Sequence, residues 1–197
     1  MRKLVFFVGG AGAGKTTIAK RLAAKRGMAV FDMDTMLRPA AKTIMTVAGL
    51  DPDDRDSAEY KVLCRDLGYR ITMDAALENV TVGTDAIVIG PFTKEIADPD
   101  WIDRELAAAA MSREDVEVKV VLVHLTDESL YRQRIEIRGL KLDEWKLAHW
   151  DEFSRSLVRR ELAWPVSSTD VLHFDNSTPM NEERFAAIER FVFGVEQ

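Results

Sequence analysis

The chain has 197 residues, the size of one compact domain, so we expect residues 1–197 to fold as a single unit. Apolar residues make up 47% and charged residues 30%, a composition that excludes disordered, collagen-like and disulfide-scaffold proteins. With 27 basic and 33 acidic residues the formal net charge is −6, so no overall positive field favours binding to nucleic acid.

The sequence contains one cysteine, Cys64, which cannot form an internal disulfide bond and is expected to be a buried thiol. No run of residues approaches the roughly 18 apolar residues that a membrane-spanning helix needs. We therefore expect a protein that does not enter membranes, and the charge and the lone cysteine favour the cytoplasm. The sequence does not distinguish a monomer from a homodimer.

Short apolar runs alternate with helical patterns along the chain. The apolar runs are typical of strands buried on both faces, and residues at helical spacing predict helices between them. The expected strands cover residues 4–8, 29–31, 86–89, 116–125 and 170–174. The expected helices cover residues 15–26, 35–48, 57–80, 101–111, 128–138 and 181–192, and residues 140–162 are expected to form a helical pair or lid. This alternation predicts an α/β domain built on a parallel sheet.

The loop after the first strand carries the strongest motif. Residues 9–16 match the phosphate-loop pattern GxxxxGK[ST], and they follow a buried strand and open a helix, as this motif requires. The glycines permit backbone angles that turn consecutive N–H groups toward an anion. Lys15 is expected to contact the β and γ phosphates, and Thr16 to offer its hydroxyl to Mg²⁺. The expected nucleotide contacts are Gly9, Gly10, Ala11, Gly12, Ala13, Gly14, Lys15, Thr16 and Thr17.

Two other interpretations of this loop are weaker. A dinucleotide-binding pattern GxGxxG would begin at Gly10 and Gly12, but its third glycine would fall on Lys15. A glycine-rich turn without a ligand would not account for the Lys-Thr pair that follows the glycines.

An acidic pair, Asp32 and Asp34, flanks Met33 at the end of the second strand. This is the edge of the sheet where ligands bind in open α/β folds. Side chains two residues apart on a strand share a face, so we expect the two carboxylates to project together. We expect Asp32 to help hold Mg²⁺ and Asp34 to accept the proton of an attacking hydroxyl. The third strand ends without the aspartate that many ATPases use for magnesium, and Asp32 would take its place. The alternative is that one of the two aspartates only caps the following helix.

Arginines cluster in the expected helix 128–138. Arg134 and Arg138 are four residues apart and therefore share one helix face. Guanidinium groups placed over a nucleotide stabilise the charge of phosphoryl transfer, so we expect both to be catalytic, within a lid at about residues 134–150. Arg132 is a weaker candidate. The alternative is a solvated face on which these arginines pair with Glu128 and Glu136.

Three further features are ambiguous from the sequence alone. Arg70 could bind an anionic group of a substrate, or pair with Asp66 or Asp74 at helical spacing. Asn176 could line an adenine pocket, or the segment 176–178 could cap the last helix. The aromatic residues of the lid region, Trp145, Trp150, Phe153 and Trp164, are more typical of packing than of a stacking surface, and His149 among them could face a substrate.

Together the phosphate loop, the Asp32-Met33-Asp34 pair, the strand ending at Gly90-Pro91-Phe92 and the arginine helix resemble the small P-loop kinases of the nucleoside-monophosphate-kinase-like group. The resemblance is nearest to the branch of shikimate and gluconate kinases, zeta-toxin-like proteins, chloramphenicol phosphotransferase and polynucleotide 5′-kinase. It implies a five-stranded parallel sheet in the order 2-3-1-4-5, ATP with Mg²⁺, Asp34 near the acceptor hydroxyl and a mobile lid. Residues 139–146 depart from the lids of shikimate and gluconate kinases, so the substrate is not transferred by analogy.

The leading functional hypothesis is a kinase that transfers the γ-phosphate of ATP to a hydroxyl of a metabolite, nucleoside or antibiotic. A kinase for a nucleic-acid 5′ end is a second hypothesis, which the acidic charge disfavours unless a basic groove leads from Arg70 to Arg138. The third is a regulatory protein that binds ATP and phosphorylates no acceptor.

Overall fold

The computed structural model describes residues 1–194, and within them the strands form one five-stranded sheet. Every pair of neighbouring strands is parallel, and the strand order is β2-β3-β1-β4-β5. Both the α/β fold and this order confirm the sequence-based prediction. The strands are β1 (Arg2–Val8), β2 (Ala29–Asp32), β3 (Ala86–Gly90), β4 (Val116–His124) and β5 (Val171–Asp175).

Helices connect the strands and cover the sheet. The α-helices are α1 (Lys15–Arg26), α2 (Met33–Val47), α3 (Ala58–Tyr60), α4 (Asp66–Thr81), α5 (Trp101–Ala108), α6 (Glu128–Arg138), α7 (Glu144–Ala148), α8 (Trp150–Ser154) and α9 (Glu182–Phe193). A π-helical turn η1 (Lys61–Arg65) and the 3₁₀ turns η2 (Glu95–Ala97), η3 (Lys141–Asp143) and η4 (Ser168–Asp170) complete the connections. None of the helices within residues 1–194 is both long and apolar enough to cross a bilayer.

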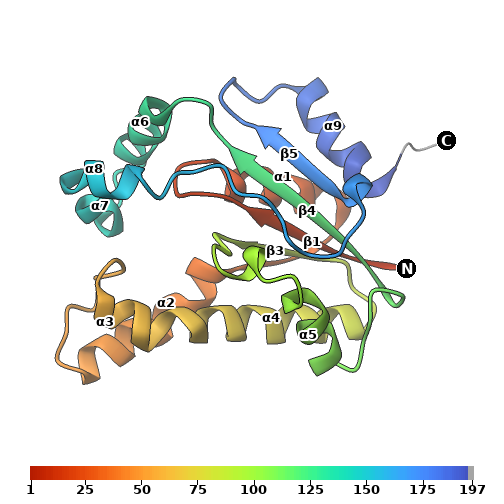
Figure 1. Ribbon diagram of the computed structural model, residues 1–197, viewed down its shortest axis with the longest axis horizontal. Coiled ribbons are helices and arrows are strands. Elements are labelled where there is room, and N and C mark those ends of the chain that lie inside the picture. The colour runs from red at the N-terminus through yellow and green to blue at the C-terminus, as the bar shows by residue number, and fades with distance from the viewer. Residues whose placement is uncertain (195–197) are drawn as a thin grey trace.

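Side chains of the central strand β1 alternate between two cores. Leu4, Phe6 and Val8 pack on the face covered by α4 and α5, whereas Val5 and Phe7 pack on the face covered by α1, α6 and α9. All five are buried, as a strand covered on both faces requires. Figure 1 shows α4 and α5 on one side of the sheet and α9 on the other.

The segment from α2 to η1 has its own small core. Leu37 and Met45 of α2 pack against Tyr60 and Cys64, which confirms that this thiol is buried. Figure 1 shows α2 and α3 at the end of the molecule that also carries α7 and α8. This arrangement places two helical segments, one before β3 and one after β4, on either side of the carboxyl edge of the sheet.

Three boundaries differ from the sequence-based expectation. Helix α2 begins at Met33 instead of Thr35, because the Asp32 side chain accepts a hydrogen bond from the backbone N–H of Asp34 and caps the helix earlier. The expected helix 57–80 contains a π-helical turn at residues 61–65. Helical structure in the lid region ends at Ser154, and residues 157–167 run as an irregular strap back along the molecule.

Candidate nucleotide-binding site

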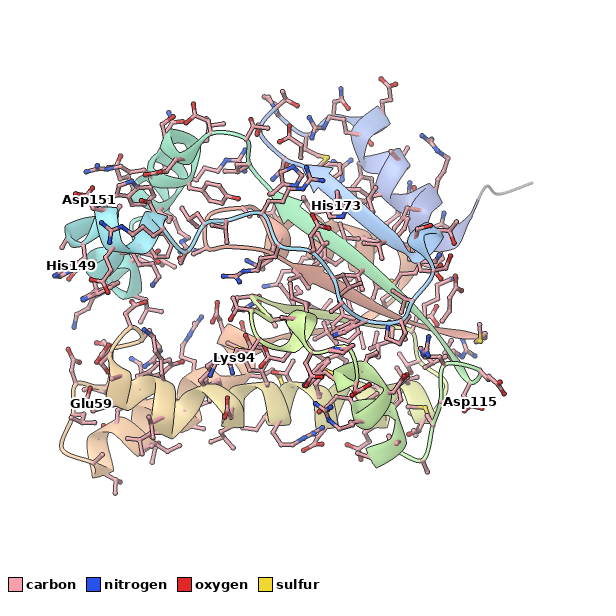
Figure 2. All side chains as sticks on the ribbon, viewed as in Figure 1. Glu59, Lys94, Asp115, His149, Asp151 and His173 are labelled. Carbon is pink, nitrogen blue, oxygen red and sulfur yellow. The ribbon has the colours of Figure 1, made fainter. Side chains whose placement is uncertain are left out.

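A cleft of about 1060 Å³ opens at the carboxyl edge of the sheet. Its lining includes Val8, Asp32 and Gly90, the last residues of β1, β2 and β3. In Figure 2, this edge of the sheet lies toward the left, where His149 is labelled in the upper helices and Glu59 of α3 in the lower ones. The cleft therefore lies where open α/β sheets bind their ligands.

The phosphate loop forms the floor of this cleft, and its backbone depends on glycine at two close approaches. Gly9 has φ 152°, and a Cβ there would collide with the carbonyl oxygen of Val123. Gly14 has φ 94°, and a Cβ there would collide with the side-chain amide of Asn176. Helix α1 begins immediately after Gly14, so its unpaired N–H groups face the same space. The loop thus has the backbone geometry of an anion cradle.

Lys15 lies at the centre of this cradle. Its Nζ donates a hydrogen bond to the carbonyl oxygen of Gly10 at 2.9 Å. Burial lowers the pKa of Lys15 to about 8, and the nearby Arg138 lowers it further, whereas the carboxylates of Asp34 and Asp32 oppose the shift. The structure therefore brings four of the predicted site residues, from α1, β2, α2 and α6, within electrostatic range of one another.

Asp32 caps helix α2 and also contacts Thr16, the other predicted metal-holding residue. One carboxylate oxygen accepts a hydrogen bond from the Thr16 hydroxyl at 3.1 Å, and the other accepts from the N–H of Asp34 at 3.1 Å. A hydroxyl and a carboxylate side by side are the hard oxygen donors that Mg²⁺ prefers. Thr16 and Asp32 therefore fit the role of metal-holding residues beside a bound triphosphate.

Asp34 lies in the first turn of α2 and not on the strand, so the expected strand geometry of the acidic pair is wrong. It is exposed and lines the cleft. Burial raises the pKa of Tyr60 to about 12, and Asp34 raises it further against the opposing charge of Arg55. Asp34 also contributes to the raised pKa of Tyr69, after the effects of burial and Glu95. Asp34 is thus the carboxylate between Lys15 and the tyrosines of the opposite wall.

Arg134 and Asn176 both line the cleft and hydrogen-bond to the phosphate loop. Arg134 donates to the carbonyl oxygens of Asn176 at 2.6 Å and Ala13 at 3.4 Å. The buried Asn176 side chain donates to the same Ala13 oxygen at 2.8 Å. Helix α9 is capped by Asn181 instead. The helix-cap interpretation of residue 176 is therefore wrong, and its contact with the loop was not visible in the sequence.

Arg138 lines the cleft and is held by Asp143, a partner that the sequence did not predict. Its Nη2 and Nε lie 2.5 and 2.8 Å from one oxygen of Asp143, a carboxylate with only 2% of its surface exposed. The second oxygen of Asp143 lies 3.6 Å from Lys146, which donates to Asp56 at 3.0 Å. This chain of charges runs from the end of α6 through the lid to the loop before α3. One aspartate in a polar segment gives no sequence signal for such a role.

Two other charged candidates lie elsewhere. Arg132 pairs with Glu136 at 3.0 Å, as the solvated-face interpretation expects. Arg70 pairs with Asp74 at 2.6 Å and Glu105 at 2.9 Å. Arg70 lines a hollow of about 380 Å³ that shares Arg65 and Tyr69 with the cleft, and Arg70 itself does not line the cleft.

The aromatic residues of the lid region mainly pack against one another. Trp164 stacks on Trp101 with ring centroids 5.2 Å apart and is part of the core. His149 stacks on Trp145 with centroids 4.7 Å apart, and it is not among the residues that line the cleft. The packing interpretation therefore holds for Trp164.

Comparison with known proteins agrees with this geometry. Residues 4–159 match the AAA_33 family, described as an AAA domain. The chain belongs to this family. Together with the phosphate loop, membership in AAA_33 implies nucleotide binding. A search of curated proteins gives no significant match.

Solved structures with the same fold include three bacterial proteins. One, described as a kinase from Chloroflexus aurantiacus, has a TM-score of 0.70 at 15% identity, and the match covers 99% of each chain. A sugar kinase from Janibacter has a TM-score of 0.63 at 18% identity, covering 98% of this AAA_33 chain and 97% of that protein. A gluconokinase from Sinorhizobium meliloti has a TM-score of 0.55 at 14% identity, covering 98% and 95% of the two chains. At these identities the likeness establishes the fold.

The lowered pKa of Lys15 leads to a prediction about nucleotide binding. A triphosphate beside this ammonium group favours its charged form, so binding raises its pKa. As the pH rises through about 8 we therefore expect proton uptake on binding to approach about one per nucleotide, and affinity to weaken. Calorimetry in buffers of different ionisation enthalpy measures this uptake, and Lys15→Met should abolish it. Binding without proton uptake above this pH would contradict the assigned environment of Lys15.

Proposed function

We propose that this AAA_33 protein is an ATP-dependent kinase that transfers the γ-phosphate to a hydroxyl of a small molecule, with residues 1–197 acting as one domain. The observation that carries the proposal is the position of Asp34. It lies in the cleft opposite the phosphate loop, near enough to Lys15 to act on its pKa. A carboxylate that faces the end of a triphosphate cradle across open space is suited to accept the proton of an attacking hydroxyl.

Each group of residues in the cleft would have a different role in phosphoryl transfer. The loop amides and Lys15 bind and orient the triphosphate, and Arg138 adds positive charge where negative charge develops on the transferred group. Arg134 acts on the loop through the Ala13 carbonyl. Thr16 and Asp32 would hold Mg²⁺, which neutralises phosphate charge when it is bound. Asp34 takes the proton as the hydroxyl oxygen attacks the γ-phosphorus and the bond to the β-phosphate oxygen breaks, leaving ADP.

The lid contacts favour a small acceptor over a polymer. Lys141 lies 2.9 Å from Asp53, and Lys146 lies 3.0 Å from Asp56, so two ion pairs join the lid to the loop before α3. The Lys146–Asp56 pair lines the cleft, and a small acceptor can bind beside it without separating the two segments. The fold likeness to a sugar kinase and a gluconokinase supports the same acceptor class by analogy.

The test is ATP consumption by the full-length protein with Mg²⁺ against a library of hydroxyl compounds, followed by identification of the phosphorylated product. We expect one acceptor class to stimulate ADP formation strongly over the rate without acceptor. Tight ATP binding with no phosphorylated product from any compound would favour the regulatory alternative. Phosphorylation of a 5′-hydroxyl oligonucleotide alone would favour the polynucleotide kinase.

Asp143 is expected to act as a positioning residue for Arg138. Asp143→Asn keeps the shape but removes the charge between Arg138 and Lys146, and a hydrogen bond between charged groups contributes about 1.5–3 kcal/mol. We therefore expect kcat with the identified acceptor to fall about tenfold or more, while the KM for ATP changes little. Steady-state kinetics measure kcat and the KM for ATP separately in Asp143→Asn. The matched control is Asp151→Asn, at an exposed position of the lid region. An equal loss in both variants would contradict the role of Asp143.

A further inference from the structure

Positive charge is concentrated in the cleft although the chain as a whole is acidic. Among the residues that the structure describes, twelve Lys and Arg side chains and four Asp side chains line the cleft, in a protein of net charge −6. The triphosphate accounts for the cations at the phosphate loop, such as Lys15 and Arg138. Several others line the cleft away from the phosphate loop, in the parts supplied by α2, the loop before α3 and residues 157–167.

Arg38, Arg159 and Arg55 are among the cleft-lining cations that have no carboxylate partner within residues 1–194. Arg38 lies one helical turn after Asp34 on α2, is exposed, and makes no hydrogen bond or ion pair with a described residue. Arg159 likewise makes none. Outside the cleft, Arg104 pairs with Asp98 at 2.5 Å.

Arg55 is the third and the most constrained of these cations. Its Nη1 donates to the carbonyl oxygens of Asp54 at 2.7 Å and Pro52 at 3.1 Å, and its guanidinium carbon lies 5.1 Å from the Tyr60 ring centre. Its Nη2 is buried and has no hydrogen-bond partner among the described residues. A buried guanidinium N–H without an acceptor is unfavourable, so a ligand atom that accepts its hydrogen bond would stabilise this site.

The three arginines come from separate segments, and each lines the same cleft as Asp34. Arg38 shares a helix with Asp34, and both Arg55 and Asp34 act on the pKa of Tyr60. Arg159 lies on the strap, residues 157–167. The strap begins beside the phosphate loop, where Leu157 lies next to Gly10. Further along, the N–H of Ala163 donates a hydrogen bond to the carbonyl oxygen of Ile96, in the segment after β3. The strap therefore crosses the cleft between the loop and β3. We call Asp34, Arg38, Arg55, Tyr60 and Arg159 the acceptor chamber.

We propose that the acceptor carries an anionic oxyacid group, a carboxylate or a phosphate, in addition to the hydroxyl that is phosphorylated. Arg38, Arg55 and Arg159 receive this group through charge-assisted hydrogen bonds, and the hydroxyl is thereby directed to Asp34. This inference rests on the proposed kinase function. A hydroxyl of a neutral sugar or polyol accepts a hydrogen bond from Nη2 of Arg55, but it leaves the positive charges of these guanidinium groups without a counter-charge.

The first step of the test separates this inference from the proposed function. The full-length protein is titrated with Mg²⁺ and a non-hydrolysable ATP analogue by calorimetry. Absence of binding overturns both proposals. When the analogue binds, the loaded protein is titrated with inorganic phosphate, and ³¹P NMR line broadening reports its binding, because the phosphate loop is then already filled.

We expect saturable phosphate binding that weakens about tenfold or more in Arg38→Gln and in Arg55→Gln. Arg104→Gln loses the same charge outside the cleft and should bind phosphate as the unmodified protein does. Arg55 also bonds within its own loop, so Arg38, which has no such contacts, keeps the test independent of folding. No saturable phosphate binding, or equal binding in all variants, overturns the inference alone.

The second step identifies the source of the anionic group. Hydroxy acids, sugar phosphates and their neutral parent sugars and polyols are compared for ATP-dependent phosphorylation. We expect turnover only with anionic members, and a KM for the accepted compound that rises about tenfold or more in Arg38→Gln. A neutral member accepted with an equal kcat/KM overturns the inference.

Discussion

Replacing Lys15 by methionine should reduce phosphoryl transfer by about 10²–10³-fold, the cost of removing one preorganised charge from the transferred phosphate. Lys15 is the cation at the centre of the loop, and burial keeps its pKa near 8 until a ligand supplies negative charge. Methionine keeps a flexible apolar stem of similar length, so the fold should remain. Steady-state ADP release with the identified acceptor, together with a thermal melt, measures both effects.

The matched control for this prediction is Lys25→Met on the same helix α1. Lys25 is half exposed and pairs with Glu189 at 2.6 Å, away from the cleft. A surface ion pair contributes at most about 1 kcal/mol to stability, so activity should stay close to that of the unmodified protein. Comparable losses in the two variants would mean that Lys15 acts through the stability of α1 and not through phosphate.

Asp34→Asn should lower kcat by about 10²–10⁴-fold and leave ATP binding nearly unchanged, because the amide fills the same space but cannot accept the proton. The side chain is exposed in the first turn of α2, where a carboxylate contributes only about 0.3–1 kcal/mol through the helix dipole. Folding should therefore survive the change. Single-turnover measurements with bound ATP isolate the chemical step from product release.

Asp103→Asn is the matched control, since Asp103 occupies the first turn of α5 outside the cleft and pairs with Arg113 at 2.7 Å. It should change stability slightly and turnover by less than about twofold. Full turnover by Asp34→Asn on an identified acceptor would exclude Asp34 as the base and would leave the position of the acceptor open.

The course of the chain through its first three strands could be predicted because local patterns are strong there. The run Leu4 to Val8 is apolar throughout, the glycines that follow allow one kind of turn, and the pattern from Lys15 is helical. Each signal depends on neighbours a few residues apart. Local sequence therefore determined the phosphate loop and the edge of the sheet at which the site lies.

The start of α2 shows how a local signal can still mislead. Asp32 and Asp34 were expected to project together from a strand, but a carboxylate that caps a helix also ends the strand before it. The other oxygen of Asp32 accepts a hydrogen bond from Thr16, sixteen residues earlier. This contact exists only once β2 lies beside β3 and α1 is in place.

Taken alone, the order of residues decided the α/β class, the anion cradle at residues 9–16 and the acidic residues opposite it, because those features arise from short-range backbone preferences. Only the tertiary structure decided that Asp143 holds Arg138, that Asn176 supports Ala13, and that Arg70 pairs away from the cleft while Arg55 lines it. Each of these contacts joins side chains whose approach depends on how the lid, the strap and the α2–α4 segment pack. The residue type determines the charge and the hydrogen-bonding capacity of a side chain, but the tertiary structure determines which partner it contacts.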